Sequence, residues 1–310
     1  MKALPALLVM AAFTSGCAKM IDYDEAIVGL KPTEVIEVGH QRVHVRQWGE
    51  TGEPIVLIHG FAVSSYAFRE LGPLLGRSHR VAAVDLNGFG YTERPDVDEA
   101  YSLEGQAALI RRVQKELGFR RAHLVGHSYG GYLVTQIAAT TPESCGSVLL
   151  ISPALGIEVA PSGFVRSPVF RKAMYPALKG VLGSRRMFRS LYERAYFDQS
   201  VLSEEVAEEY RRQLRVEGLN RAYRGFGSSL GEVAVGEAAT LEQVSVPVMV
   251  IAGEQDQIIR LEALESELEG VRDVKLRAIP ESGHSSPEEK PEEVAREILG
   301  FLREHPLEDH

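Results

Sequence analysis

The sequence is poor in the residues that build disulfide scaffolds and metal centres. Cysteine occurs only at Cys17 and Cys145 among 310 residues, and the nine histidines are too scattered for the short spacings of a zinc site. We therefore expect no disulfide and no metal, and we assign no cofactor. No lysine- or arginine-rich tract stands out and the net charge is −9, so nucleic acid and anionic membrane surfaces are poor candidate partners.

The N-terminal apolar run is too short to span a bilayer. Lys2 precedes apolar residues over 3–13 and small residues over 14–16, a pattern typical of a secretory signal, so we predict a signal peptide over residues 1–16. Cys17 resembles the lipidated cysteine of bacterial lipoproteins. This resemblance implies an exported, membrane-anchored protein that faces the periplasm or the cell exterior. A plain cleaved signal, which would leave a secreted or periplasmic protein, is the alternative.

The remaining composition is that of a soluble globular protein, with 45% hydrophobic and 25% charged residues. A chain of this length can form one large α/β domain with an insertion, or two small domains. Four continuous apolar runs predict strands that are buried on both faces of a parallel sheet, at residues 54–58, 80–85, 147–151 and 246–252. Helical patterns alternate with them, at residues 103–117, 261–268 and 291–302. A hairpin over residues 35–46 comes first, and a last strand is expected over 274–279. The pattern therefore predicts an α/β fold with a mostly parallel central sheet and helices on both faces.

The alternation stops after Ser152 and resumes near Glu237. The stretch between them is rich in arginine and aromatic residues and holds a clear helical pattern over 203–214. A segment of that length is not a structureless loop of a compact domain, so we predict an inserted helical cap. From the N-terminus, the predicted organisation is a signal peptide 1–16, a tether 17–33, the first part of the core 34–152, a helical cap 153–236, and the second part of the core 237–310.

A serine lies between two glycines at the junction of a predicted strand and a predicted helix. The stretch Gly126-His127-Ser128-Tyr129-Gly130 follows apolar residues and precedes a helical run. Such a sharp turn exposes a serine hydroxyl and directs backbone N–H groups toward it. With His59-Gly60-Phe61 and the loop after Asp85, this nucleophile elbow resembles the α/β-hydrolase superfamily of serine esterases and lipases. The resemblance covers about Val35 to Leu302, and it implies the α/β-hydrolase fold.

The resemblance also implies a catalytic triad in the order serine, acid, histidine. Ser128 is the expected nucleophile and His284, after the last predicted strand, the expected base. Asp256, after the preceding strand, is the expected acid, with Glu254 as the alternative. The backbone N–H groups of Phe61 and Tyr129 are the expected oxyanion donors.

We therefore expect a serine hydrolase that cleaves a carboxylic ester of a small or medium apolar substrate. A serine at the elbow argues against haloalkane dehalogenases and epoxide hydrolases, which carry aspartate there. Three alternatives remain: a carbon–carbon bond hydrolase, a haloperoxidase-like or acyltransferase relative, and a membrane-tethered ligand-binding protein without turnover. The aromatic residues of the predicted cap suggest a pocket for an apolar acyl or aryl group, or they simply form the hydrophobic core of the cap. They are Phe164, Phe170, Tyr192, Tyr196 and Phe197.

Overall fold

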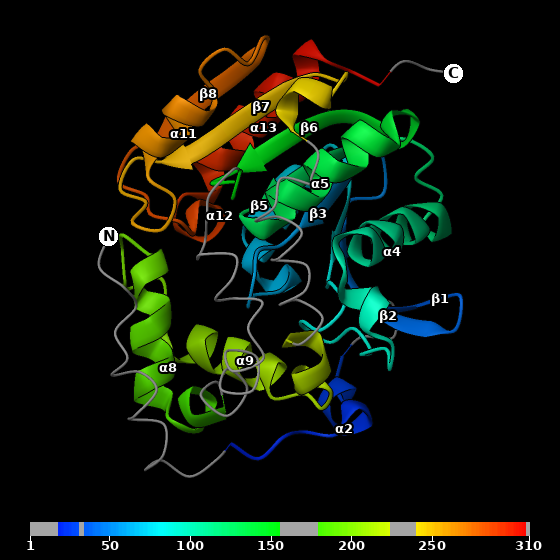
Figure 1. Ribbon diagram of the computed structural model, residues 1–310, viewed down its shortest axis with the longest axis vertical. Coiled ribbons are helices and arrows are strands. Elements are labelled where there is room, and N and C mark those ends of the chain that lie inside the picture. The colour runs from blue at the N-terminus through cyan, green and yellow to red at the C-terminus, as the bar shows by residue number, and fades with distance from the viewer. Residues whose placement is uncertain (1–17, 31–33, 156–178, 224–239, 308–310) are drawn as a thin grey trace.

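The computed structural model describes residues 18–30, 34–155, 179–223 and 240–307. The described residues form an eight-stranded sheet with the order β1-β2-β4-β3-β5-β6-β7-β8 (Figure 1). Its strands are β1 Val35–Val38, β2 Gln41–Trp48, β3 Pro54–Ile58, β4 Arg80–Val84, β5 Ala122–His127, β6 Cys145–Ile151, β7 Val248–Gly253 and β8 Val274–Ile279. The strands from β3 to β8 are parallel, whereas β1 and β2 form the expected antiparallel hairpin and β2 joins β4 antiparallel. This topology confirms the predicted fold class.

Helices cover both faces of the sheet, as the apolar runs predicted. The longer helices of the core are α3 Leu71–Leu75, α4 Leu103–Glu116, α5 Tyr129–Thr140, α11 Leu261–Glu267 and α13 Pro291–Glu304. The short elements η2 Ser65–Phe68, η3 Asp98–Tyr101, η4 Pro142–Ser144, η6 Leu241–Gln243 and α12 Ser286–Glu289 lie in connections. Ile55 and Leu57 share a buried cluster with α3 and α13, whereas Val56 and Ile58 share one with α4 and α5. Successive strand residues point to opposite faces, so a fully apolar strand fills both layers.

Local signals in the sequence set the ends of the helices. The hydroxyl of Ser102 accepts a hydrogen bond of 3.0 Å from the N–H of Gly105 and caps α4. Gly118, just beyond that helix, has φ +70°, a conformation that glycine adopts without strain. Pro291 begins α13, where its missing N–H costs nothing. The predicted boundaries coincide with the observed ones or differ from them by one or two residues, as is usual for fraying ends.

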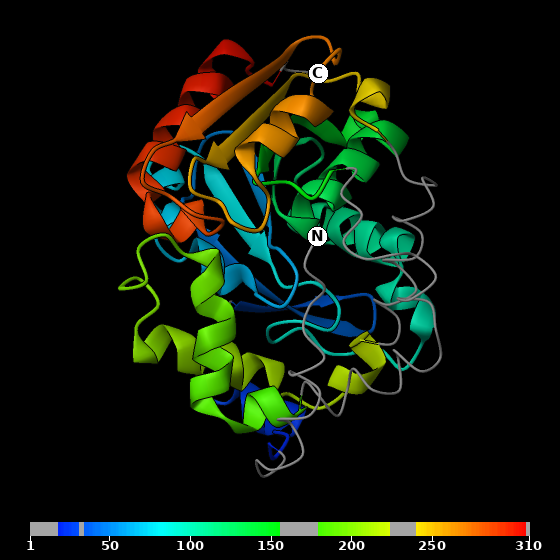
Figure 2. The same ribbon diagram turned by 60° about the vertical axis from the view of Figure 1, so that its left-hand side comes forward.

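Between β6 and β7, the described part of the chain includes the helices α8 Arg185–Tyr192 and α9 Glu204–Leu214, with η5 Glu193–Ala195 between them. Ser184 and Ser203 cap them through hydrogen bonds to backbone N–H groups. Both helices lie off the end of the sheet toward which β6 and β7 point (Figure 1). The turned view shows α8 next to the chain around α12 (Figure 2). Most of the rest of the predicted cap, at 156–178 and 224–239, lies outside the described residues, so the limits of the cap remain a prediction.

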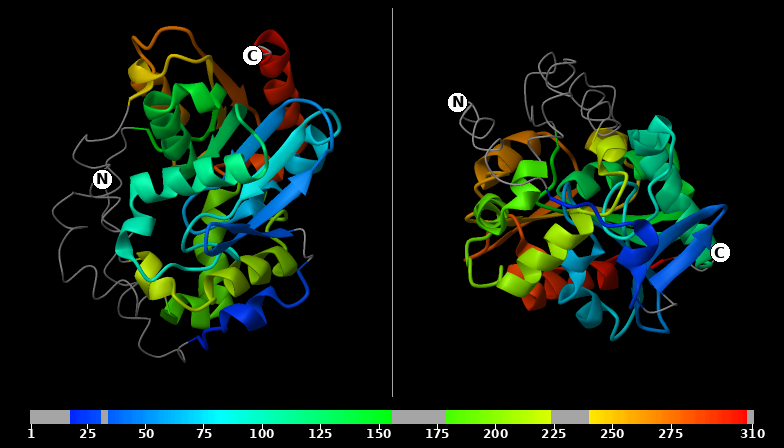
Figure 3. Two further views of the ribbon diagram at one scale, coloured as in Figure 1. Left: turned by 90° about the vertical axis from the view of Figure 1, so that its right-hand side faces the viewer. Right: turned by 90° about the horizontal axis from the view of Figure 1, so that it is seen from below.

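Residues 18–30 differ from the plain tether that the sequence suggested. Asp22 caps a short helix, α2 Tyr23–Ile27, and the side chain of Ala26 is buried. Ile21 exchanges backbone hydrogen bonds of 2.7 and 2.8 Å with Arg215 and Glu217, just beyond α9. Viewed from below, α2 lies beside α9 (Figure 3). The segment packs because Ala26 joins Tyr91 and Val216 in a small apolar cluster. The predicted signal and Cys17 lie outside the described residues.

No helix among the described residues is long and apolar enough to cross a membrane.

Candidate active site

The turn between β5 and α5 holds Ser128 in a strained backbone conformation. Its φ is 52° and its ψ is −116°, a combination rarely adopted by a residue with a side chain. Hydrogen bonds of 2.9 Å from its N–H to the carbonyl of Ile151, and from the N–H of Gly131 to its carbonyl, maintain this turn. A Cβ at Gly126 would lie 2.3 Å from the carbonyl oxygen of Gly130, so the chain can make the turn only without a side chain there.

Asp256 and His284 follow β7 and β8 and lie in contact. Nδ1 of His284 donates to Oδ2 of Asp256 at 2.8 Å, and both side chains are largely buried. Oδ1 of Asp256 accepts from the N–H groups of Ile258 and Ile259 at 2.8 and 2.9 Å. Burial alone would raise the pKa of Asp256, but these hydrogen bonds, above all that from His284, lower it on balance. An ionised carboxylate therefore keeps the proton of His284 on Nδ1 and leaves Nε2 as the basic nitrogen.

His127 connects the loop of His284 to the elbow. Its Nε2 donates to the backbone carbonyl of His284 at 2.8 Å, and the centroids of the two rings are 4.9 Å apart. Burial, followed by the nearby His284, lowers the pKa of His127 to about 3, so this ring is neutral and can donate through Nε2. Ser128 is the next residue in the chain. The loop after β8 thus reaches back over β6 and β7 to the nucleophile elbow.

The residues from His59 to Ala62 lie directly against the elbow. A Cβ at Gly60 would meet Cβ of Ser128 at 3.0 Å and Nδ1 of His127 at 3.3 Å. Nδ1 of His59 donates to the carbonyl of Gly60 at 2.7 Å, and its Nε2 accepts from the N–H of Leu86 at 3.0 Å. Burial lowers the pKa of His59, which suits this neutral bridge. Phe61 and Tyr129, the predicted oxyanion donors, therefore flank the position of Ser128 on two chain segments.

The loop after β4 has a structural role. Oδ2 of Asp85 contacts Nδ1 of His44 at 2.7 Å and accepts from the N–H of Tyr91 at 2.8 Å, and Oδ1 accepts from the N–H of Ser65 at 2.6 Å. Asp85 is fully buried, and these contacts, led by His44, outweigh the effect of burial and hold its pKa far below the usual range. The carboxylate thus joins three segments of the chain. Glu254, the alternative acid, is exposed, whereas Asp256 contacts His284.

Two consecutive carboxylates, which the sequence did not single out, join the inserted helices to the loop of His284. Glu288 is buried, pairs with Arg69, and accepts from the hydroxyls of Tyr196 and Tyr210 at 2.8 and 3.0 Å. Glu289 accepts from the N–H groups of Phe197 and Asp198 at 2.7 and 2.8 Å, and from that of Gly283 at 2.8 Å. No sequence signal marks these carboxylates, because their partners are distant in the chain. Those of Glu288, for example, lie 78 to 219 residues away.

Of the predicted cap aromatics, Tyr192 and Tyr196 make hydrogen bonds to the core, and Phe197 is half exposed. Phe164 and Phe170 lie outside the described residues. Among the described residues, no group of three histidine, cysteine or acidic side chains could hold a metal ion. Cys145 is buried, as expected of a small apolar residue.

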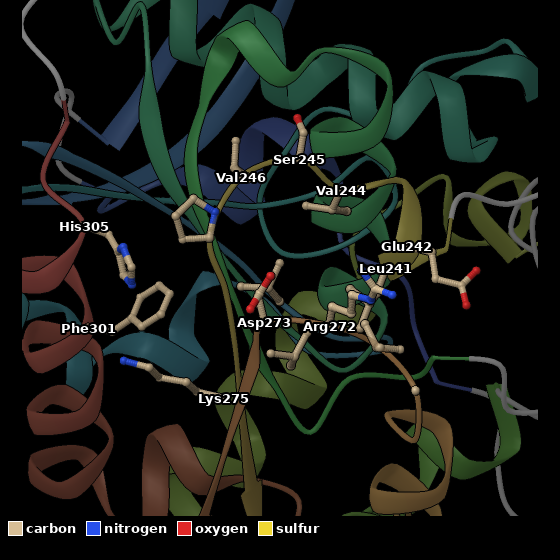
Figure 4. Close-up of a pocket in the computed structure, with 15 residues that line it drawn as sticks. Leu241, Glu242, Val244, Ser245, Val246, Arg272, Asp273, Lys275, Phe301 and His305 are labelled. Atoms are coloured by element: carbon tan, nitrogen blue, oxygen red, sulfur yellow. The ribbon is translucent and has the colours of Figure 1, made fainter.

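A cavity of about 800 Å³ lies at the other end of the sheet (Figure 4). It is lined by the amino ends of β7 and β8, η6 and the end of α13, including Val246, Lys275, Phe301 and His305. The candidate catalytic residues follow the carboxyl ends of the strands, and none of them lines this cavity. Ligand sites of open α/β sheets lie at the carboxyl ends, so the cavity is not the candidate active site.

Comparison with known proteins decides the family. Residues 53–291 match the family described as alpha/beta hydrolase fold. The chain belongs to the alpha/beta hydrolase fold family. This alpha/beta hydrolase is 27% identical over 266 residues to the uncharacterized hydrolase YugF of Bacillus subtilis (strain 168), which covers 81% of this chain and 90% of YugF. It is 26% identical over 278 residues to a 2-hydroxy-6-oxo-6-phenylhexa-2,4-dienoate hydrolase of Comamonas testosteroni, covering 84% of this chain and 91% of that enzyme. Its structure matches the crystal structure of wild-type Cfl2 from Burkholderia cenocepacia with a TM-score of 0.74 and 25% identity, over 87% of this chain and 95% of Cfl2.

Proposed function

We propose that this alpha/beta hydrolase is a serine hydrolase that cleaves a carboxylic ester of a small or medium apolar substrate. Oγ of Ser128 attacks the ester carbonyl while Nε2 of His284 takes its proton, and Asp256 stabilises the imidazolium that forms. The backbone N–H groups of Phe61 and Tyr129 hold the oxyanion. His284 then protonates the leaving alcohol. Water, deprotonated by the same imidazole, hydrolyses the acyl-enzyme and releases the acid and free Ser128.

One observation carries the proposal: the hydrogen-bonded pair of Asp256 and His284 belongs to a loop that His127 joins to the elbow. An unassisted serine hydroxyl is a weak nucleophile, and a neutral imidazole oriented by a carboxylate is the group that activates it near neutral pH. The strained backbone of Ser128 adds support, because strain of this kind is retained where exposure of a side chain requires it.

A fluorophosphonate probe tests the nucleophile, because it forms a stable bond only with an activated serine. We expect it to label the wild type and not Ser128→Ala, and we expect the same substitution to remove hydrolysis of short p-nitrophenyl esters. Ser245→Ala, at an exposed serine beside the cavity at the other end of the sheet, is the matched control and should behave as the wild type. A wild type that is not labelled would favour the non-enzymatic alternative, a tethered ligand-binding protein of this fold.

Carbon–carbon bond hydrolysis is the second candidate, favoured by the relative from Comamonas testosteroni that is named as a dienoate hydrolase. The two candidates share the triad and differ in the substrate. Turnover numbers on a p-nitrophenyl ester and on a coloured ring-cleavage dienoate, measured on the same preparation, distinguish them. We expect kcat/KM to be higher for the ester, and a preference for the dienoate would replace the ester proposal. Transfer of the acyl group to an added alcohol would reveal the acyltransferase alternative.

We also propose that the protein is exported and anchored through a lipid on Cys17. The support is the basic, apolar and small-residue pattern that precedes this cysteine. Expressed in a bacterium, the wild type should fractionate with membranes, and Cys17→Ser should leave them. Cys145→Ser is the control, because Cys145 is buried in the core. Retention of Cys17→Ser in the membrane fraction would contradict lipidation, and an unprocessed cytoplasmic product would contradict export.

A further inference from the structure

A cap tyrosine contacts the loop that is proposed to hold the oxyanion. The hydroxyl of Tyr192, the last residue of α8, donates a hydrogen bond to the backbone carbonyl of Ala62. Ala62 directly follows Phe61, whose N–H is one of the two proposed oxyanion donors. Gly60, on the other side of Phe61, lies against Ser128. The contact therefore joins the inserted helices to the segment beside the nucleophile.

The backbone of Ala62 needs such a restraint. Its φ is 61°, in the left-handed region where a residue with a Cβ is strained by about 1–3 kcal/mol. A strained conformation persists only when its surroundings hold it. Relaxation of Ala62 to a negative φ would turn the peptide planes next to it and displace the N–H of Phe61.

The ring of Tyr192 is itself held in place by two neighbouring rings. It stacks on Phe188 with centroids 4.3 Å apart and on Tyr210 with centroids 5.8 Å apart. Tyr210 is fixed in turn by the hydrogen bond from its hydroxyl to buried Glu288. Burial raises the pKa of Tyr192 well above 10, so the hydroxyl keeps its proton and remains a donor.

We infer that Tyr192 is a positioning residue for the oxyanion hole: its hydroxyl holds Ala62 in the left-handed conformation and so directs the N–H of Phe61 toward the reacting carbonyl. This inference rests on the proposed function. It makes the oxyanion hole depend on the inserted helices, because the donor comes from α8 and the acceptor from the core. The site is then complete only when the helices are docked.

Tyr192→Phe removes the hydroxyl and leaves the stacked ring. Loss of a whole oxyanion donor lowers kcat by about 10²–10³-fold, and a displaced donor costs part of that, so we expect kcat to fall about tenfold with KM within about twofold. The inhibition constant of a trifluoromethyl ketone, which forms an oxyanion on the serine, should rise by a similar factor. Tyr101→Phe is the matched control, because its hydroxyl also donates to a backbone carbonyl, that of Pro95 at 2.7 Å.

A second substitution tests the role of the strain. Glycine adopts positive φ without cost, so Ala62→Gly in the Tyr192→Phe background should restore kcat by several-fold. A general loss of packing would not be restored in this way. Amide hydrogen exchange at residues 59–63 should be faster in Tyr192→Phe than in Tyr101→Phe.

The outcomes separate this inference from the proposed function. Suppose that the wild type hydrolyses esters and that Tyr192→Phe keeps kcat within twofold, whether or not its KM rises. The positioning role is then wrong and the serine mechanism stands. If the wild type is neither labelled nor active, the proposed function fails, and the oxyanion role of Tyr192 fails with it. Hydrogen exchange then still decides whether Tyr192 holds the loop.

Discussion

Gly60 offers the most direct test of the geometry beside Ser128. A Cβ built there would lie 3.0 Å from Cβ of Ser128, 3.3 Å from Nδ1 of His127 and 3.4 Å from the carbonyl oxygen of His127. The backbone of Gly60 is not in the left-handed region, so alanine suits its φ. Gly60→Ala therefore changes one thing, the space between the loop and the elbow.

The size of the effect follows from these distances. At a contact distance of 3.0 Å, the neighbouring atoms must move apart by a few tenths of an ångström. Ser128 has little freedom to yield, because its strained turn is held by backbone hydrogen bonds to Ile151 and Gly131. The loop that carries Phe61 must move instead. Removing an oxyanion donor costs about 10²–10³ in kcat, and a shift well under 1 Å should cost about tenfold. Overpacking at one methyl group should destabilise the fold by about 1 kcal/mol.

The assay compares kcat on a p-nitrophenyl ester with the free energy of unfolding in urea. The matched control is Gly300→Ala, because a Cβ there would meet only Nη2 of Arg303 at 3.9 Å, on the helix α13. We expect this control to keep the wild-type kcat. Its free energy of unfolding should rise by about 0.5–1 kcal/mol, since alanine is the better helix former. If Gly60→Ala leaves both kcat and the free energy of unfolding unchanged, the proposed position of the oxyanion loop is refuted.

The remaining predictions concern the charges and the thiol. Asp256→Asn should lower kcat by roughly 10³–10⁴-fold without much loss of stability, because an amide no longer keeps the proton of His284 on Nδ1; a loss below tenfold would contradict the pairing. Glu288→Gln should lower the melting temperature by roughly 6–12 °C, since it removes the carboxylate charge beside the largely shielded Arg69 at a cost of about 3 kcal/mol and leaves that arginine only a longer ion pair with exposed Glu70. Glu304→Gln, in an exposed pair, should shift it by less than about 2 °C, and equal shifts would refute the difference. Burial raises the pKa of the Cys145 thiol to about 12, so it should react with DTNB at pH 8 only after unfolding, and reaction in the folded state would contradict its burial.

The parts of the fold that could be predicted are those with local signals. The run from Pro54 to Ile58 is apolar at every position, and it is a strand buried on both faces. Ser102 caps the helix that the pattern over 103–117 predicted, and the elbow glycines surround a strained serine. The order of strands along the chain was enough to bring Asp256 and His284 to neighbouring loops, because parallel strands end at one edge of the sheet.

Contacts between distant side chains could not be predicted. Nothing in the sequence indicates that the ring of His127 lies beside that of His284 and donates to the carbonyl of that residue, which is 157 positions away. Residues 18–30 were predicted as a tether, and the reason for their packing, the apolar contact of Ala26 with Tyr91 and Val216, has no local signature. Such contacts depend on which segments meet, and periodicity and turn residues do not carry that information.

The two carboxylates at Glu288 and Glu289 imply that the cap and the catalytic base are positioned together. Glu289 binds the N–H of Gly283, the residue before His284, with the same carboxylate that binds the cap at Phe197 and Asp198. The N–H of Ser285, just after His284, donates to the carbonyl of Ala195 at 3.0 Å. A displacement of these cap residues must therefore pull on both neighbours of the base. Substitutions that loosen the cap should thus lower kcat as well as alter the choice of substrate.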